Sequence, residues 1–149
     1  MTRLFNKVPP VNKPHVLVLA STYPRGLDDP EPAFVHQLCT RLTSRFRVTA
    51  VVPDAPGADP SGPLEGVQVV RYRYAPKRLQ TLVNNGGIIN NLRRSRWKWL
   101  LVPSFVAAQY FMVRRLLRQD HIDVIHAHWL IPQGLIARSV GRPRRVPYV

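Results

Sequence analysis

Short, nearly continuous apolar runs alternate along this chain with segments whose apolar residues recur at helical spacing. Four of the runs are strand-like: His15–Ser21, Arg47–Val52, Val67–Tyr74 and Ile122–Ala127. Their hydrophobicity on successive positions is typical of strands covered on both faces, as in a parallel sheet. Residues 146–149 open a fifth run of the same kind.

Three segments between these runs have the apolar spacing of helices. They are a segment with Phe34, Val35, Leu38 and Leu42 that follows Pro32, a segment with Phe105, Ala108, Met112 and Leu116, and Leu130–Val140 with Pro132 near its start and Gly141 at its end. Alternation of strand and helix predicts right-handed βαβ units. The expected fold class is α/β, a Rossmann-like parallel sheet flanked by helices that ends within the fifth strand.

Proline and other turn residues mark the segments outside these elements. Residues 1–14 contain Pro9, Pro10 and Pro14 and are expected to form an irregular N-terminal arm. Residues 15–149 form one domain of ordinary size, and 22–32, 54–66 and 84–87 are expected to be loops or breaks. The apolar run around residues 99–113 contains Pro103 and is shorter than a bilayer span, which predicts a core or interfacial helix.

Charge is distributed very unevenly. The chain has 22 Lys and Arg against 8 Asp and Glu, a net charge of +14 at pH 7, and no acidic residue lies between Gly66 and Gln119. Such a field attracts phosphate groups on nucleic acids, nucleotide-sugars or anionic lipids. Within it, Arg93, Arg94, Arg96, Trp97, Lys98 and Trp99 interleave cations with tryptophans before an apolar run. That pattern suits a membrane interface, and equally a basic turn before a core helix.

Polar, aromatic and glycine residues follow the fourth expected strand, where open α/β folds place their ligands. His126 and His128 lie two positions apart and should share one face of that strand. Trp129, Gln133 and Gly134 follow, the last two where a helix N-terminus offers free N–H groups. Tyr23, Arg25 and Gly26 occupy the loop after the first strand, which should open on the same edge of the sheet.

Taken in order, residues 15–24, Pro32–Val35, Arg47–Pro53 and above all 123–137 resemble the N-terminal, acceptor-side domain of a GT-B glycosyltransferase of family 4. The resemblance implies transfer of a sugar from a nucleotide-sugar to an acceptor hydroxyl, in cell-surface glycan or glycolipid synthesis. It implies a cleft between this domain and a donor-binding domain, and no metal or other cofactor. The donor-binding domain, and a His-Gly usual beyond the fifth strand, are absent from this sequence, so we expect an apparently truncated, incomplete domain.

The resemblance assigns roles to the residues singled out above. His128 and His126 would hydrogen-bond an acceptor hydroxyl, Trp129 would stack on a sugar or cover the cleft floor, and Arg25 could face a phosphate. Expected partners are a sugar or lipid-linked acceptor, an anionic membrane surface, and a separately encoded donor-binding domain. The expected location is the cytoplasm, peripheral on the inner face of the membrane. A non-catalytic docking subunit of a split transferase and an inactive relic remain open alternatives.

Other classes of protein fit the sequence less well. A dehydrogenase would need Gly-x-Gly-x-x-Gly after the first strand, which is missing. His126 and His128 could hold zinc only with further ligands, and His15, His36 and His121 lie elsewhere in the pattern. Nucleic-acid binding would rest on charge without a recognisable motif. Cys39, the single cysteine, lies in an apolar helical pattern and is expected to be a buried, inert thiol.

Overall fold

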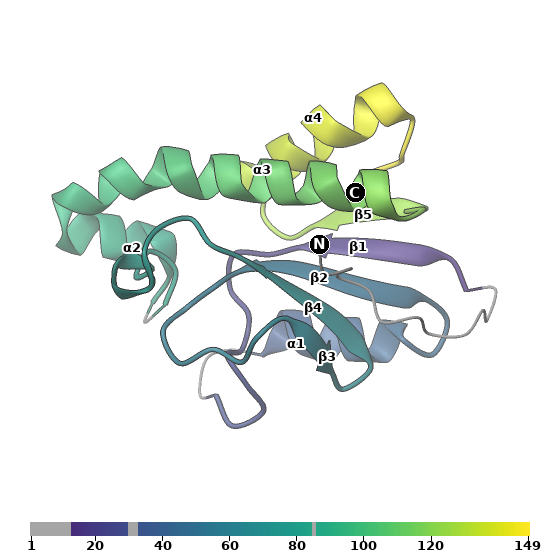
Figure 1. Ribbon diagram of the computed structural model, residues 1–149, viewed down its shortest axis with the longest axis horizontal. Coiled ribbons are helices and arrows are strands. Elements are labelled where there is room, and N and C mark those ends of the chain that lie inside the picture. Colours follow the sequence, from purple (N-terminus) through teal and green to yellow (C-terminus); the bar gives the residue numbers. More distant parts are fainter. Residues whose placement is uncertain (1–12, 30–32, 85) are drawn as a thin grey trace.

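A computed structural model describes residues 13–29, 33–84 and 86–149. The arm expected over residues 1–14 therefore lies outside the described residues except for Lys13 and Pro14, and so does Pro32. Within the described residues, a five-stranded sheet is flanked by helices, which confirms the Rossmann-like α/β class (Figure 1).

The strands of the sheet run in the order β3-β4-β2-β1-β5. They are β1 (His15–Leu19), β2 (Arg47–Pro53), β3 (Gly62–Leu64), β4 (Val67–Tyr72) and β5 (Val124–Ala127). Strands β1, β2, β4 and β5 pair in parallel, so their carboxyl ends meet at one edge of the sheet. Tyr148 adds an isolated parallel bridge to Ile125, at the position of the fifth expected strand.

Strand β3 was not expected, because residues 54–66 were predicted to be a loop throughout, and that prediction is wrong. Gly62–Leu64 instead pairs antiparallel with β4, so the sheet is mixed rather than purely parallel. The two strands are joined by Glu65 and Gly66, with φ of 45° and 82°. Positive φ at both central residues is the backbone of a tight hairpin turn, and glycine adopts it without steric cost. The third expected strand was also too long, because β4 ends at Tyr72 rather than Tyr74.

The helices are α1 (Phe34–Leu42), α2 (Gly87–Arg94), α3 (Leu101–Gln119) and α4 (Leu135–Arg144), with 3₁₀ turns at Lys77–Leu79 and Arg96–Leu100. The helix expected over Leu130–Val140 is wrong at both ends. Residues 130–134 form an irregular turn in which Ile131 is extended. Helix α4 continues through Gly141, where a side chain would come 2.8 Å from the Val146 carbonyl oxygen. The glycine thus permits the returning chain to pack closely, and the left-handed residue after the helix is Arg145.

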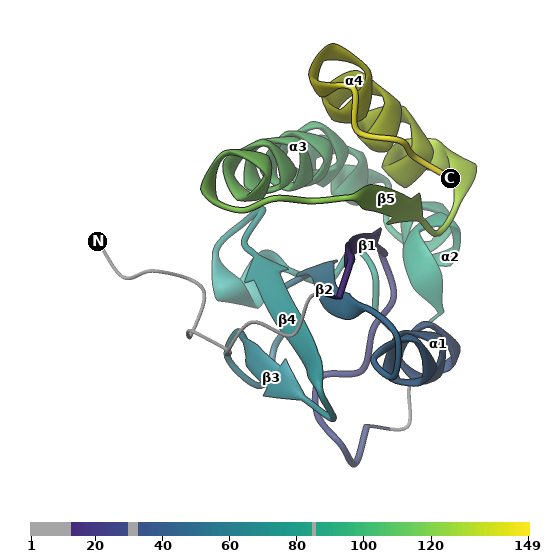
Figure 2. The same ribbon diagram turned by 90° about the vertical axis from the view of Figure 1, so that its right-hand side faces the viewer.

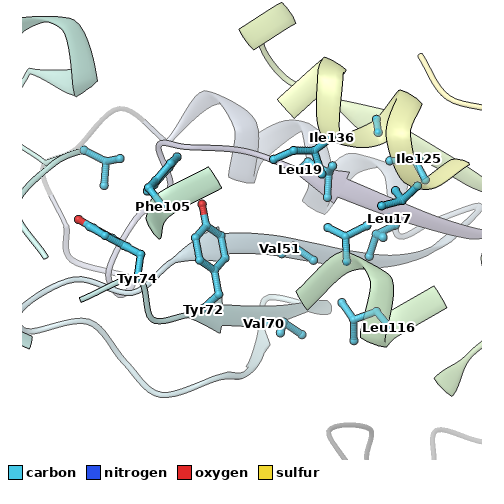
Figure 3. Close-up of a cluster of buried hydrophobic side chains, with 14 of the residues drawn as sticks. Leu17, Leu19, Val51, Val70, Tyr72, Tyr74, Phe105, Leu116, Ile125 and Ile136 are labelled. Atoms are coloured by element: carbon cyan, nitrogen blue, oxygen red, sulfur yellow. The ribbon is translucent and has the colours of Figure 1, made fainter. Parts of the chain in front are cut away.

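Alternate residues of the strands face two separate layers. Helices α3 and α4 cover one face of the sheet and α1 covers the other (Figures 1 and 2). Leu17, Leu19 and Val51 pack under α3 and α4, while Val16 and Val18 pack under α1. Figure 3 shows the first layer, where the rings of Tyr72 and Tyr74 meet Phe105 edge-on, with centroids 5.7 and 5.1 Å apart.

The expected apolar faces of two helices need adjustment. In α1 the buried residues are Val35, His36 and Cys39, whereas Phe34 and Leu38 are exposed. The single cysteine is buried as expected, and burial raises the pKa of its thiol to about 11. In α3 the buried residues are Leu101, Phe105, Gln109, Val113 and Leu116. Phe105 and Leu116 were expected, whereas Gln109 and Val113 are buried instead of the preceding Ala108 and Met112.

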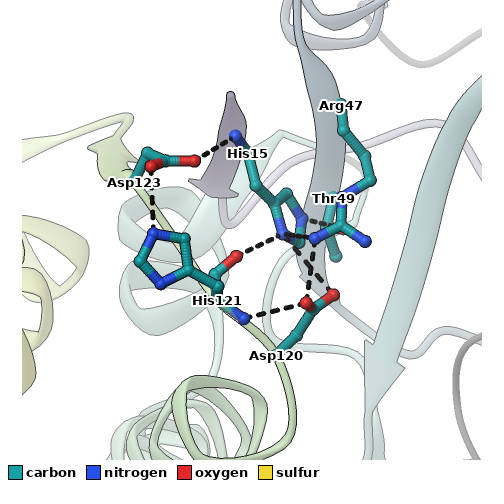
Figure 4. A network of polar contacts seen from close by, with 6 residues as sticks. All are labelled: His15, Arg47, Thr49, Asp120, His121 and Asp123. Carbon is teal, nitrogen blue, oxygen red and sulfur yellow. Dashed lines mark hydrogen bonds and ion pairs between the residues drawn. The ribbon is translucent and has the colours of Figure 1, made fainter. Parts of the chain in front are cut away.

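A polar network closes the amino-terminal edge of the sheet, opposite the candidate site (Figure 4). The buried His15 ring places Nε2 2.8 Å from the Thr49 hydroxyl and Nδ1 3.0 Å from the His121 carbonyl oxygen. Its backbone N–H donates to Asp123, and Arg47 pairs with Asp120 at 2.9 Å. Burial, followed by the charge of Arg47, lowers the pKa of His15, so the ring is neutral near pH 7.

Candidate functional site

The carboxyl edge of the parallel strands brings the ends of β1 and β5 side by side. The two strands pair in parallel up to Leu19 and Ala127. The ladder is extended by one further hydrogen bond, from the His128 N–H to the Leu19 carbonyl oxygen (2.9 Å). His128 is therefore fixed at the tip of β5, as expected from its spacing.

His126 and His128 share a face of β5. Their rings stack with centroids 4.6 Å apart and an angle of 29° between the planes. Burial lowers the pKa of both rings, and the neighbouring His126 lowers that of His128 further. Both are therefore neutral near pH 7, each with one nitrogen that donates and one that accepts. Among the described residues, Nε2 of His128 is buried and has no hydrogen-bond partner.

Two further aromatic rings border this pair. Phe34, the first residue of α1, meets both His128 and Trp129 edge-on, with centroids 6.2 Å apart in each case. Trp129 is exposed and has φ of 82°, a conformation that costs a non-glycine residue strain and is common at functional sites. In the sequence, Phe34 belongs to the apolar pattern of a helix and was not expected at the site. Its position at the start of a helix that follows the first loop was the available signal that it borders the site.

Gln133 and Gly134 follow Trp129 in the irregular turn. The expectation of a free backbone N–H at Gly134 is wrong, because that group donates to the Trp129 carbonyl oxygen (3.1 Å). Gln133 is fully buried, and neither polar atom of its side chain has a partner among the described residues. The turn therefore offers a buried amide rather than an open helix N-terminus, and α4 begins only at Leu135.

Tyr23 lies in the loop after β1 but does not join the histidine pair. It is buried under α1, where its hydroxyl lies 2.7 Å from Nδ1 of His36. Nε2 of His36 lies 2.7 Å from the carboxylate of Glu65 in the β3–β4 turn. Burial raises the pKa of Tyr23, so the phenol keeps its proton. Through these two contacts, His36 connects the loop after β1 to α1 and to the β3–β4 hairpin.

Arg25 and Gly26 belong to the same loop, and the structure gives both internal contacts. The guanidinium of Arg25 donates to both carboxylate oxygens of Asp29, each at 2.9 Å, so its charge is paired within the loop. A side chain at Gly26 would come 2.8 Å from a carboxylate oxygen of Asp59. The guanidinium of Arg71 in β4 donates to the carbonyl oxygens of Pro24 and Arg25 in this loop and to that of Asp59.

The basic and aromatic segment lies at the end of α2 and in the turn before α3. Arg93, Arg94 and Arg96 are exposed, as are Trp97 and Trp99. Lys98 differs, because its ammonium donates to the Thr81 carbonyl oxygen and to the Asn91 side chain, each at 3.0 Å. It ties the turn to α2, so the arginines and tryptophans form the outward face.

No three His, Cys, Asp or Glu side chains among residues 13–29, 33–84 and 86–149 are grouped so that they could hold a metal ion. In the same part of the chain, Arg96–Gln119 is one helical stretch long and apolar enough to cross a membrane by length and composition. Core helices meet that criterion too, and this one packs Phe105, Val113 and Leu116 against the sheet.

The fold and the site define an α/β protein whose polar and aromatic side chains gather at the carboxyl edge of a parallel sheet. Residues 33–149 match the model for Glycosyltransferase Family 4. Because this match covers most of the chain, the protein belongs to glycosyltransferase family 4, and the resemblance found in the sequence is confirmed. No curated protein and no solved structure matches the chain.

Proposed function

We propose that this chain supplies the acceptor-binding part of a glycosyltransferase that moves a sugar from a nucleotide-sugar to an acceptor hydroxyl. Membership of family 4 supports sugar transfer in general. The observation that carries the finer assignment is the pair of neutral, stacked imidazoles at the tip of β5. The acceptor we propose is a sugar or a lipid-linked sugar, in synthesis of a cell-surface glycan or glycolipid at the inner face of the membrane.

The chemistry of the pair suits a hydroxyl ligand. A neutral imidazole can accept the proton of a hydroxyl at one nitrogen while its other nitrogen donates. Nε2 of His128 is buried and no group of the described residues pairs with it, which costs free energy until a ligand or water supplies a partner. The exposed ring of Trp129 lies beside it and offers an apolar face to a sugar ring. Phe34 keeps this corner apolar.

The residues of this site can hold and orient an acceptor hydroxyl, and we assign them no part in binding the nucleotide-sugar donor. In a retaining transfer, the departing diphosphate is stabilised by cations and assists the incoming hydroxyl. Arg25, the cation expected near the site, is paired with Asp29. We therefore propose that the donor's diphosphate is held by groups other than Arg25, in a donor-binding domain.

Acceptor binding by the purified chain tests the proposal. A panel of mono- and oligosaccharides and their lipid-linked forms is titrated while the ring signals of His126 and His128 are followed by NMR. We expect one acceptor class to shift both rings and His128→Ala to weaken its binding about tenfold, the worth of a hydrogen bond to a neutral buried group. His121→Ala is the control, because that histidine is exposed at the opposite edge of the sheet.

Transfer assays with labelled nucleotide-sugars separate the remaining cases. Transfer by the chain alone would show that it needs no partner. Acceptor binding without transfer, followed by transfer when a donor-binding domain is added, would support a split enzyme. If no acceptor shifts the histidine rings, or if His121→Ala and His128→Ala weaken binding equally, the assignment of this site is wrong.

A further inference from the structure

An apolar groove lies between α3 and the start of α4, on the face of the sheet away from α1. Its volume is about 620 Å³. It is lined almost entirely by hydrocarbon side chains, among them Val102, Val106, Phe111, Ile131 and Leu135. A groove of this size accommodates a hydrocarbon chain, and only Tyr110 and Ser139 bring side-chain hydroxyls to its lining.

The groove continues into an apolar surface that nothing in the described chain covers. Phe111 is 63% exposed, Ile131 70% and Leu135 52%, and Leu100 and Leu130 are more exposed still. Trp97 and Trp99 lie in the turn just before α3, and Trp129 just before the groove-lining turn. The three tryptophans of the chain are thus all exposed, in the turns that lead into the two helices that border the groove. Contiguous exposed apolar side chains of this kind mark an interaction surface.

Charge indicates what covers this surface. Arg93, Arg94 and Arg96 are exposed beside it, at the end of α2 and in the turn that leads directly into α3. Figure 1 shows that this end of α3 extends past the sheet, next to α2. No acidic side chain occurs between Gly66 and Gln119 to offset these cations. Arginines flanking exposed tryptophans and an apolar groove are complementary to a bilayer surface, with its phosphates, its interfacial depth and its acyl chains.

We propose that this surface binds an anionic lipid bilayer, and that the groove between α3 and α4 takes an acyl chain of a membrane phospholipid. The arginines at positions 93, 94 and 96 contact lipid phosphates, and the indoles lie at headgroup depth. Ile131, in the groove lining, follows His128 by a few residues, so the histidine pair lies close to the bound bilayer. This inference concerns lipid binding alone and does not rest on the proposed sugar transfer.

Binding of the chain to vesicles tests the proposal. Vesicles of phosphatidylcholine with about 30% phosphatidylglycerol, which gives them an anionic surface, are compared with vesicles of phosphatidylcholine alone. We expect binding to the anionic vesicles and quenching of tryptophan fluorescence by lipids brominated along the acyl chain. The triple variant Arg93→Gln, Arg94→Gln, Arg96→Gln should weaken binding about 100-fold, because each cation near the surface contributes roughly fivefold.

The groove itself is tested by Phe111→Ser with Leu135→Ser. Loss of two inserted side chains should weaken vesicle binding about 30-fold or more. The control for the groove is Leu27→Ser with Leu38→Ser, because these leucines are 69% and 36% exposed in the loop after β1 and in α1. The control for charge is the triple variant Arg41→Gln, Arg45→Gln, Arg118→Gln. Both control variants should bind vesicles within about threefold of the unchanged chain, the effect expected of residues remote from the surface.

Three results would overturn the proposal. Loss of binding in the arginine variant without any loss in the groove variant would mean adsorption by charge alone. Self-association of the chain that Phe111→Ser with Leu135→Ser abolishes would mean that a second copy occupies the groove. If the groove variant fails to fold, which its thermal transition would show, fluorescence quenching of the unchanged chain tests the proposal. If brominated lipid does not quench the tryptophans, they do not insert into the bilayer and the proposal is wrong.

Discussion

The rings of His126 and His128 stack with centroids 4.6 Å apart on one face of β5, close enough for His126 to affect the proton affinity of His128. Burial lowers the pKa of both, and His126 lowers that of His128 further. We expect both rings to titrate below the usual value of 6.5 in an NMR titration, and His126→Phe to raise the pKa of His128 because one source of the lowering is removed. A His128 titration that is unchanged in this variant would mean that the two rings are independent.

Stability should fall as the pH is lowered through the histidine range. His15 has a lowered pKa in the folded chain, so the unfolded chain binds its proton more readily. The free energy of unfolding contributed by this difference is therefore full above about pH 7 and is lost as the pH falls below the unfolded value near 6.5. Urea unfolding at pH 7.5 and pH 5.5 measures the difference. His15→Gln should show a smaller change between the two pH values than the unchanged chain.

Gly141→Ala should destabilise the domain. The new Cβ would lie 2.8 Å from the Val146 carbonyl oxygen, which is backbone and cannot rotate away, and 3.2 Å from the Tyr148 ring. We expect a loss of about 1–3 kcal/mol in the free energy of unfolding, the usual cost of overpacking. Gly62→Ala is the control, because its Cβ would meet no atom closer than 3.9 Å. Equal effects of the two substitutions in thermal unfolding would contradict this account.

Arg71→Met should loosen the loop after β1. This guanidinium donates to three backbone carbonyl oxygens, of Pro24, Arg25 and Asp59, and it is largely buried. Removing it leaves those oxygens short of a donor, at a cost of about 1–3 kcal/mol. Hydrogen exchange of the amides in residues 23–29 should speed up. Arg73→Met is the control, since that exposed side chain has one 3.4 Å ion pair with Asp54, worth about 0–1 kcal/mol.

The parallel strands were readable from the sequence because burial on both faces leaves a continuous apolar run. The short β3 was not, since Gly62–Leu64 contains a glycine and a proline and pairs only through the tight Glu65–Gly66 turn. The role of Gly141 was not readable from the sequence either. A glycine near a helix end usually ends it, but here it admits a backbone carbonyl oxygen from Val146, a contact that only the folded chain reveals.

The histidine pair was predicted because period two along a strand is a strict geometric rule. The hydrogen-bond partners of Arg25 and Lys98 were not predicted, because the sequence does not show which acceptor a long cationic side chain reaches. Arg25 pairs with Asp29 four positions on, and Lys98 reaches Thr81 and Asn91. Phe34 likewise satisfied a helical pattern yet projects toward the site. The roles proposed for the site residues in acceptor binding remain predictions.

Helix α3 has structural demands on two sides. Phe105, Val113 and Leu116 fill the layer against the sheet, while Val102, Val106 and Phe111 line the groove on its other side. An ordinary surface helix accepts polar substitutions over half of its circumference. In a library of single substitutions scored for both folding and lipid binding, α3 should therefore tolerate few polar replacements on either side. Its freedom to vary would be confined to the narrow strip that carries Arg115 and Arg118.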